Sequence, residues 1–159
     1  KFFKSMFFYN RGFYNNCSHF INILFQFLNK PQKIEIINKG NNWNNDIQPD
    51  VIFRYKKGEI MFINSVKKNI INNQFILISN NKKYVSDSYF GNIESYKLSN
   101  NSYILEEKIN MNHSITQKIT LNKILKYIEQ NSNIRKLSAS YLDTIEVLDK
   151  VKKLNTLRK

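Results

Sequence analysis

The stretch that decides the fold reads Pro49-Asp-Val-Ile-Phe-Arg-Tyr-Lys-Lys-Gly-Glu-Ile-Met-Phe-Ile-Asn64. Two runs rich in β-branched and aromatic residues, 51–55 and 59–64, flank a Lys-Lys-Gly turn at 56–58. A short connection that contains glycine and joins two apolar runs is typical of an antiparallel hairpin. We therefore predict that these runs are neighbouring strands of one sheet.

The segments before this hairpin have their own patterns. Residues 20–28 repeat apolar side chains at spacings of three and four, which predicts a helix. Pro31 cannot continue a helix, so this one should stop near Asn29. Residues 33–38 then predict a strand, and the Asn-rich stretch 39–46 predicts a loop.

The region between Asn69 and Leu121 contains several short β-type runs separated by Asn-Asn and Ser-Asn turns. Strands are predicted at 74–78, 83–85, 103–105 and 114–119. Periodicity leaves two readings open: a β-rich extension of the same sheet, or an irregular insertion that wraps a partner.

Two helical patterns close the sequence. The shorter covers residues 121–128 and the longer covers 141–154. Ser140 followed by Asp143 resembles a capping box at the start of the longer helix. Acidic residues precede basic ones along it, the order that suits the helix dipole.

The net charge is strongly positive. The 159 residues, enough for one core with extensions, include 25 Lys and Arg against 12 acidic residues, a formal charge of +13. A/T-rich codon usage accounts for part of the Lys and Asn content, but it does not forbid Asp and Glu, and no acid precedes Glu35. Such an excess indicates a polyanionic partner.

Basic side chains occur mostly in pairs. Each pair alone is most often a solvated turn, but phosphate contacts need only positive charge on a flexible stem, and the abundance of Lys over Arg favours backbone binding over base reading. The residues predicted to contact RNA are Lys1, Lys4, Arg11, Arg54, Lys56, Lys57, Lys67, Lys68, Lys82, Lys83, Arg135 and Lys136.

Residues 1–14 are basic, acid-free and aromatic. Phe7, Tyr9, Phe13 and Tyr14 could stack on exposed bases, or could pack on a neighbouring protein or on the domain's own core. An aromatic extension without a core of its own usually becomes ordered only against a partner. The composition is also compatible with the region just after a cleaved organellar targeting peptide, which indicates the mitochondrial matrix.

The sequence offers little for catalysis. A nucleophilic pair would need Cys17 with His19 or His113, and the more ordinary role is a packing thiol beside a solvated or RNA-facing histidine. A structural zinc site needs about four Cys or His ligands, and this sequence contains one Cys and two His. Neither of the glycine-rich nucleotide-binding motifs, GxGxxG and GxxxxGK[ST], occurs. We therefore expect no enzyme activity, no cofactor and no metal. No apolar run is long enough to span a membrane.

A family resemblance rests on four sequence features. The predicted helix, the Asn29-Lys30-Pro31 stop, the strand 34–37 and the stretch 46–55 before Gly58 resemble a thioredoxin-like family. Mitochondrial ribosomal proteins share that family, including large-subunit protein forty-three and small-subunit protein twenty-five, as does a small accessory subunit of respiratory complex I. The match covers about residues 15–65 and 120–130, and it implies a scaffold without a redox centre, in agreement with the lone Cys17.

These observations predict an α+β fold: a small thioredoxin-like mixed sheet with flanking helices, a β-rich insertion and a C-terminal helix. Residues 1–14 would be an extension, 15–131 a single domain with 65–119 inserted, and 132–159 a helical extension. The expected function is that of a non-catalytic constituent of the mitochondrial ribosome that binds rRNA and neighbouring ribosomal proteins, with no small-molecule substrate. The alternative is an accessory subunit of a mitochondrial respiratory complex.

Overall fold

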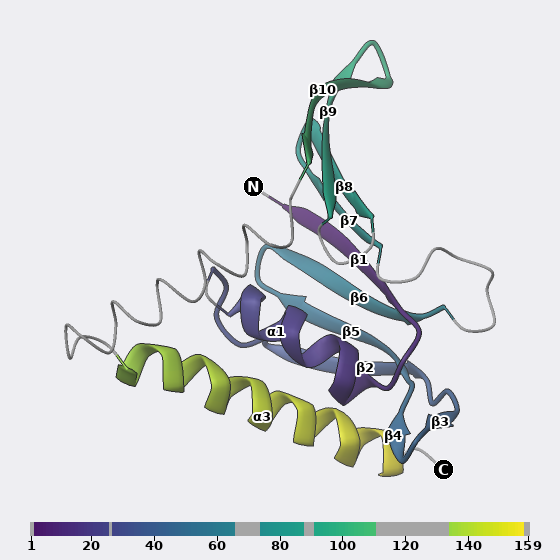
Figure 1. Ribbon diagram of the computed structural model, residues 1–159, viewed down its shortest axis with the longest axis vertical. Helices are drawn as coiled ribbons and strands as arrows, with labels where there is room; N and C mark the ends of the chain where they lie inside the picture. The colour runs from purple at the N-terminus through teal and green to yellow at the C-terminus, as the bar shows by residue number, and fades with distance from the viewer. Residues whose placement is uncertain (1, 26, 66–73, 88–90, 111–133, 158–159) are drawn as a thin grey trace.

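A computed structural model describes residues 2–25, 27–65, 74–87, 91–110 and 134–157. One mixed sheet of eight strands has the order β10-β9-β8-β7-β1-β6-β5-β2 (Figure 1). Its strands are β1 (Phe3–Tyr9), β2 (Lys33–Asn38), β5 (Asp50–Tyr55), β6 (Gly58–Asn64), β7 (Phe75–Ser79), β8 (Lys82–Asp87), β9 (Asn92–Ser99) and β10 (Ser102–Asn110). A separate ribbon pairs β3 (Asn42–Trp43) with β4 (Asp46–Ile47). The helices are the π-helical turn η1 (Phe13–Cys17), α1 (Ser18–Leu24) and α3 (Ile134–Leu157).

The first strand lies in the interior of this sheet. β1 pairs in parallel with β6 and antiparallel with β7, and its side chains Phe7 and Tyr9 are buried. The residues predicted as an N-terminal extension therefore belong to the sheet, and they need no partner to be ordered. Gly58 allows the close approach of β1, because a Cβ at Gly58 would lie 2.3 Å from the backbone oxygen of Phe3.

Two helices cover one face of the sheet. Figure 1 shows α1 and α3 side by side over β6, β5 and β2, while β8, β9 and β10 project beyond them as an arm. Alternate residues of the covered strands, such as Phe53 and Phe62, meet Phe20 and Val151 of the helices in one buried core. Stacking of Phe7 on Phe20, with ring centroids 4.4 Å apart, ties β1 to α1.

Several local predictions are confirmed. The hairpin of 51–55 and 59–64 is β5 and β6, with Arg54 opposite Glu59, and the strand 33–38 is β2. β7, β8 and β10 cover three of the predicted downstream runs, and they continue the sheet outward from β1. Of the two readings left open, the structure therefore has the sheet extension. The α+β mixed sheet with flanking helices and a C-terminal helix is confirmed.

Other local predictions are wrong or lie outside the described residues. The predicted loop 39–46 contains β3 and the start of β4, joined at Asn44 and Asn45, whose φ angles are 45° and 65°. Ser140 is not a cap, because α3 begins upstream of it at Ile134. The predicted strand 114–119 and helix 121–128 fall outside the described residues. The division of the chain into domains at 131–132 stays a prediction.

Candidate functional site

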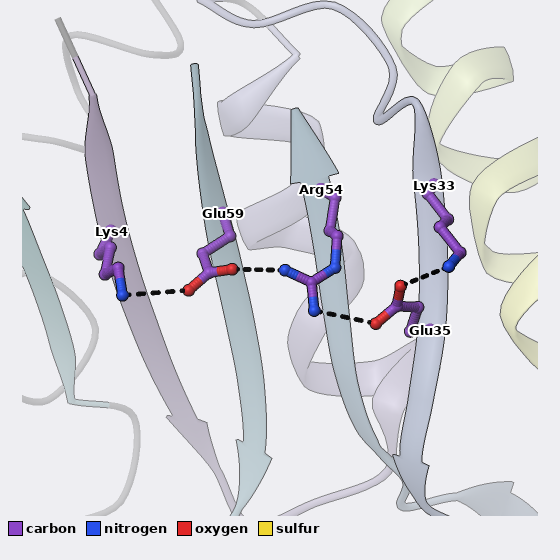
Figure 2. Close-up of polar contacts among 5 residues, drawn as sticks. All are labelled: Lys4, Lys33, Glu35, Arg54 and Glu59. Atoms are coloured by element: carbon purple, nitrogen blue, oxygen red, sulfur yellow. Dashed lines mark hydrogen bonds and ion pairs between the residues drawn. The ribbon is translucent and has the colours of Figure 1, made fainter. Parts of the chain in front are cut away.

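Among the described residues, three of the predicted RNA-contacting side chains, Lys4, Arg54 and Lys82, pair with carboxylates of the same chain. Figure 2 shows a ladder of alternating charge that crosses four neighbouring strands on the sheet face that the helices leave open. Its contacts are Lys4 to Glu59 at 3.6 Å, Glu59 to Arg54 at 2.7 Å, Arg54 to Glu35 at 3.0 Å and Glu35 to Lys33 at 2.7 Å. The Arg54 guanidinium, and then Lys33, lower the pKa of the Glu35 carboxyl to about 2.

The remaining basic residues are scattered over other elements. Lys82 pairs with Glu106 at 3.0 Å, and the Lys83 ammonium lies 5.2 Å and 5.6 Å from the ring centroids of Tyr96 and Tyr103. Lys56 and Lys57 are exposed in the β5–β6 turn, Arg11 is exposed after β1, and Arg135 and Lys136 belong to the first turns of α3. Lys1, Lys67 and Lys68 lie outside the described residues. The structure thus shows internal neutralisation at several of these positions.

The thiol and imidazole considered for catalysis differ in solvent exposure. Cys17 is fully buried in the core, and burial raises the pKa of its thiol. His19 is exposed on α1. Because the thiolate is the nucleophilic form, Cys17 is a packing residue in this fold.

A polar site is built where β1 passes into the helix. The Asp46 carboxylate of β4 accepts the backbone N–H groups of Tyr14 at 3.1 Å and Asn15 at 2.8 Å, so it caps the first turn of η1. Gly12 makes this approach possible, since a Cβ there would lie 2.0 Å from the Asp46 carboxyl. Single π-helical turns are frequent at functional sites, which directs attention to this junction.

A pocket of about 470 Å³ opens beside this cap. Its polar lining residues are Tyr14, Asn15, Asn44, Asn45, Asp46 and Lys152. The phenol of Tyr14 donates to the Asp149 carboxylate of α3 at 3.2 Å. Burial, reinforced by this hydrogen bond, raises the pKa of Tyr14 to about 12, so the phenol stays protonated at neutral pH.

The pocket combines hydrogen-bond donors and acceptors. The side-chain amide of Asn15 and the ammonium of Lys152 are donors, and the Asp46 carboxylate is an acceptor. His19 is exposed on α1 and is not among the lining residues. Among the described residues no group of His, Cys, Asp and Glu is arranged to hold a metal ion. The amide, carboxylate and ammonium groups of the lining suit a polar organic molecule.

Sequence reasoning missed this site for a definable reason. The Asn-rich stretch 39–46 was interpreted as a plain loop, and residues 1–14 as an extension, so Asp46 was not connected with the start of the helix. The one local signal is Gly12 directly before an apolar helix, a position where backbone and another group approach closely.

The fold is similar to that of several solved oxidoreductase structures. A Bacillus subtilis protein named as an oxidoreductase superposes with a TM-score of 0.72 at 11% identity, over 98% of this chain and 56% of that one. A Clostridium difficile dehydrogenase gives 0.63 at 11%, over 95% and 53% of the two chains. A Vibrio cholerae oxidoreductase of the Gfo/Idh/MocA family gives 0.60 at 8%, over 97% and 53%. The chain spans about half the length of the structures it matches, and identities this low establish the fold alone.

No family model and no curated protein matches the sequence. The structural neighbours nevertheless overturn the predicted family, because none of those described is a thioredoxin-like ribosomal protein. The helix, strand and hairpin order is present, but here β1 precedes the helix within the same sheet and β7–β10 enlarge it.

The functional predictions that rested on that family are corrected with it. Neighbours named as oxidoreductases contradict the predicted role of a non-catalytic ribosomal or respiratory subunit. They also contradict rRNA and ribosomal proteins as partners and the expected absence of a small-molecule substrate. Phosphate contact by the individual basic residues stays a prediction, but the ribosomal family resemblance no longer supports it. Within the described residues, no helix has the length and apolarity needed to cross a membrane.

Proposed function

We propose that this chain forms the substrate-binding part of an oxidoreductase that acts on a polar small molecule. The observation that carries this proposal is the likeness of nearly the whole chain to structures named as oxidoreductases and dehydrogenases. The pocket beside the Asp46 cap supplies a place for such a substrate, with Asn15 and Lys152 as hydrogen-bond donors.

A reaction of this class also needs a group that orients the substrate oxygen. Oxidation of an alcohol or reduction of a carbonyl moves a proton from or to that oxygen, so a donor that holds it in place favours the reaction. Lys152 lines the pocket from α3. We assign it the role of orienting the substrate oxygen.

The residues at the strand-to-helix turn do not fit a dinucleotide cofactor. In dinucleotide-binding folds, a glycine-rich turn leaves the helix N-terminal N–H groups free for the phosphates. Here the Asp46 carboxylate already accepts the N–H groups of Tyr14 and Asn15, and a second anion beside it would be repelled. We therefore place the redox carrier on a part of the enzyme other than the described residues.

The proposal is tested by ligand binding. Amide chemical shifts of the isotope-labelled protein are followed during titration with polyols, hydroxy acids and sugars. We expect saturable shifts at Asn15, weakened in Lys152→Ala and unchanged in Lys153→Ala, an exposed neighbour that does not line the pocket. Equal behaviour of the two variants, or no saturable shift with any compound, would contradict the assignment.

The mitochondrial matrix stays a predicted location, and subcellular fractionation tests it.

A further inference from the structure

A second cavity lies on the helix-covered side of the sheet, away from the polar pocket. It has a volume of about 420 Å³ and is formed between α1 and the strands β1, β6 and β7. Phe20, Ile23 and Leu24 line it from the helix, and Phe3 and Leu77 line it from the strands. None of its described lining residues also lines the Tyr14–Lys152 pocket.

One buried hydroxyl in this cavity has no partner. Ser5 lines the cavity from β1 and is only 3% exposed, and its Oγ makes no hydrogen bond to any described residue. A buried hydroxyl without a partner has lost its hydrogen bonds to water and gained none in return, which destabilises the folded state. Apolar packing at this position would avoid that cost, so the hydroxyl needs a reason to face the cavity.

The rim of the cavity is also unusually apolar for a surface. Ile23 is 44% exposed and Phe27 is 83% exposed, and both line the cavity. None of the described lining residues carries a charge. A charged group buried here would lose its hydration without a counter-ion, which excludes carboxylates and phosphates as the buried end of a ligand.

We propose that this cavity binds an aliphatic or aromatic small molecule that carries one uncharged hydrogen-bonding group, such as an alcohol or ketone. The apolar body of the ligand covers the side chains of α1 and β7, and its oxygen forms the hydrogen bond that Ser5 Oγ lacks. The volume lies within the range of about 300–1,000 Å³ found for small-molecule sites. Ile23 and Phe27 lose solvent exposure when the ligand is seated.

The experiment uses 1-octanol as the probe and octanoate as its charged counterpart, followed by methyl chemical shifts of Leu24 and Leu77. We expect saturable shifts with 1-octanol and much weaker ones with octanoate. Ser5→Ala should weaken 1-octanol binding about five- to tenfold, which is the value of one hydrogen bond of about 1–1.4 kcal/mol. The variant removes an unpaired hydroxyl, so the fold should remain intact.

A variant at the rim of the cavity provides a second test. Ile23→Glu should abolish binding of 1-octanol, whereas Leu142→Glu, at an exposed apolar position of α3, should leave it unchanged. Absence of saturable binding to the unmodified protein would overturn the proposal. So would equal affinity in Ser5→Ala and Ile23→Glu, or nuclear Overhauser contacts between Leu77 and residues 111–133 in the ligand-free protein, which would show that the chain fills its own cavity.

Discussion

Replacement of Phe62 by alanine tests the core that holds β1 and α1 together. The Phe62 ring is fully buried at the centre of an aromatic cluster. Its centroid lies 4.7 Å from that of Phe53, 5.5 Å from Phe13, 6.0 Å from Phe20 and 6.2 Å from Phe7. Truncation therefore removes four ring contacts that join β6 to β5, β1, the π-helical turn and α1.

The expected loss follows from these contacts. Phe→Ala substitutions in cores cost about 3–5 kcal/mol, and aromatic pairs add about 0.5–1.5 kcal/mol each beyond area burial. We expect a loss of about 4–5 kcal/mol in the free energy of unfolding, a large share of the roughly 5–15 kcal/mol that a typical domain possesses. Partial collapse of the cluster around the gap would lower this value.

Urea denaturation followed by far-ultraviolet circular dichroism measures the effect. The midpoint should fall while the m-value stays unchanged, because the surface exposed on unfolding is nearly the same. Phe27→Ala is the matched control, since Phe27 is 83% exposed and should change stability by less than about 0.5 kcal/mol. A loss below about 1 kcal/mol for Phe62→Ala would refute the central position of this ring.

Three further predictions concern the polar contacts. Asp46→Ala should lower the free energy of unfolding by about 1–2 kcal/mol through loss of the helix cap. Asp143→Ala, at a half-buried position of α3 where the carboxylate pairs with Lys30 at 3.1 Å, should have a smaller effect in the same urea assay. The Glu35 carboxyl should titrate near pH 2 by carbon-13 NMR, so its stabilising contribution is present above its unfolded pKa of about 4.3 and is lost as the pH falls towards 2. Arg54→Gln should raise this titration midpoint, and an unchanged midpoint would contradict the charge ladder. The phenol of Tyr14 should ionise with a midpoint near 12 in ultraviolet titration, and a midpoint near 10 would contradict both the burial of the phenol and its hydrogen bond to Asp149.

The charge ladder changes how the basic composition is interpreted. Lys4, Arg54 and Lys82 look like free cations in the sequence, because their carboxylate partners lie on other strands, 5 to 55 residues away. Cross-strand register brings Glu35, Glu59 and Glu106 against them. Exposed pairs of this kind contribute about 0–1 kcal/mol each, so the ladder sets local electrostatics more than stability.

Local sequence patterns were sufficient to predict several secondary-structure elements. The β5–β6 hairpin follows from a glycine turn between two apolar runs, and β2 follows from a β-type run bounded by Pro31 and Gly40. The segment that became α3 was visible through its helical spacing. Each of these signals is contained within a few consecutive residues, where backbone preference and side-chain period act directly.

The tertiary structure alone decided the place of β1, the role of the basic residues and the polar pocket. β1 pairs with β6, whose residues come 55 positions later, and no local pattern records a parallel pairing of that separation. The pocket depends on Asp46 reaching the N–H groups of Tyr14 and Asn15 across 31 or more positions. Such contacts form only when the chain closes long loops, so their partners are chosen by packing of the whole sheet and not by the residues beside them.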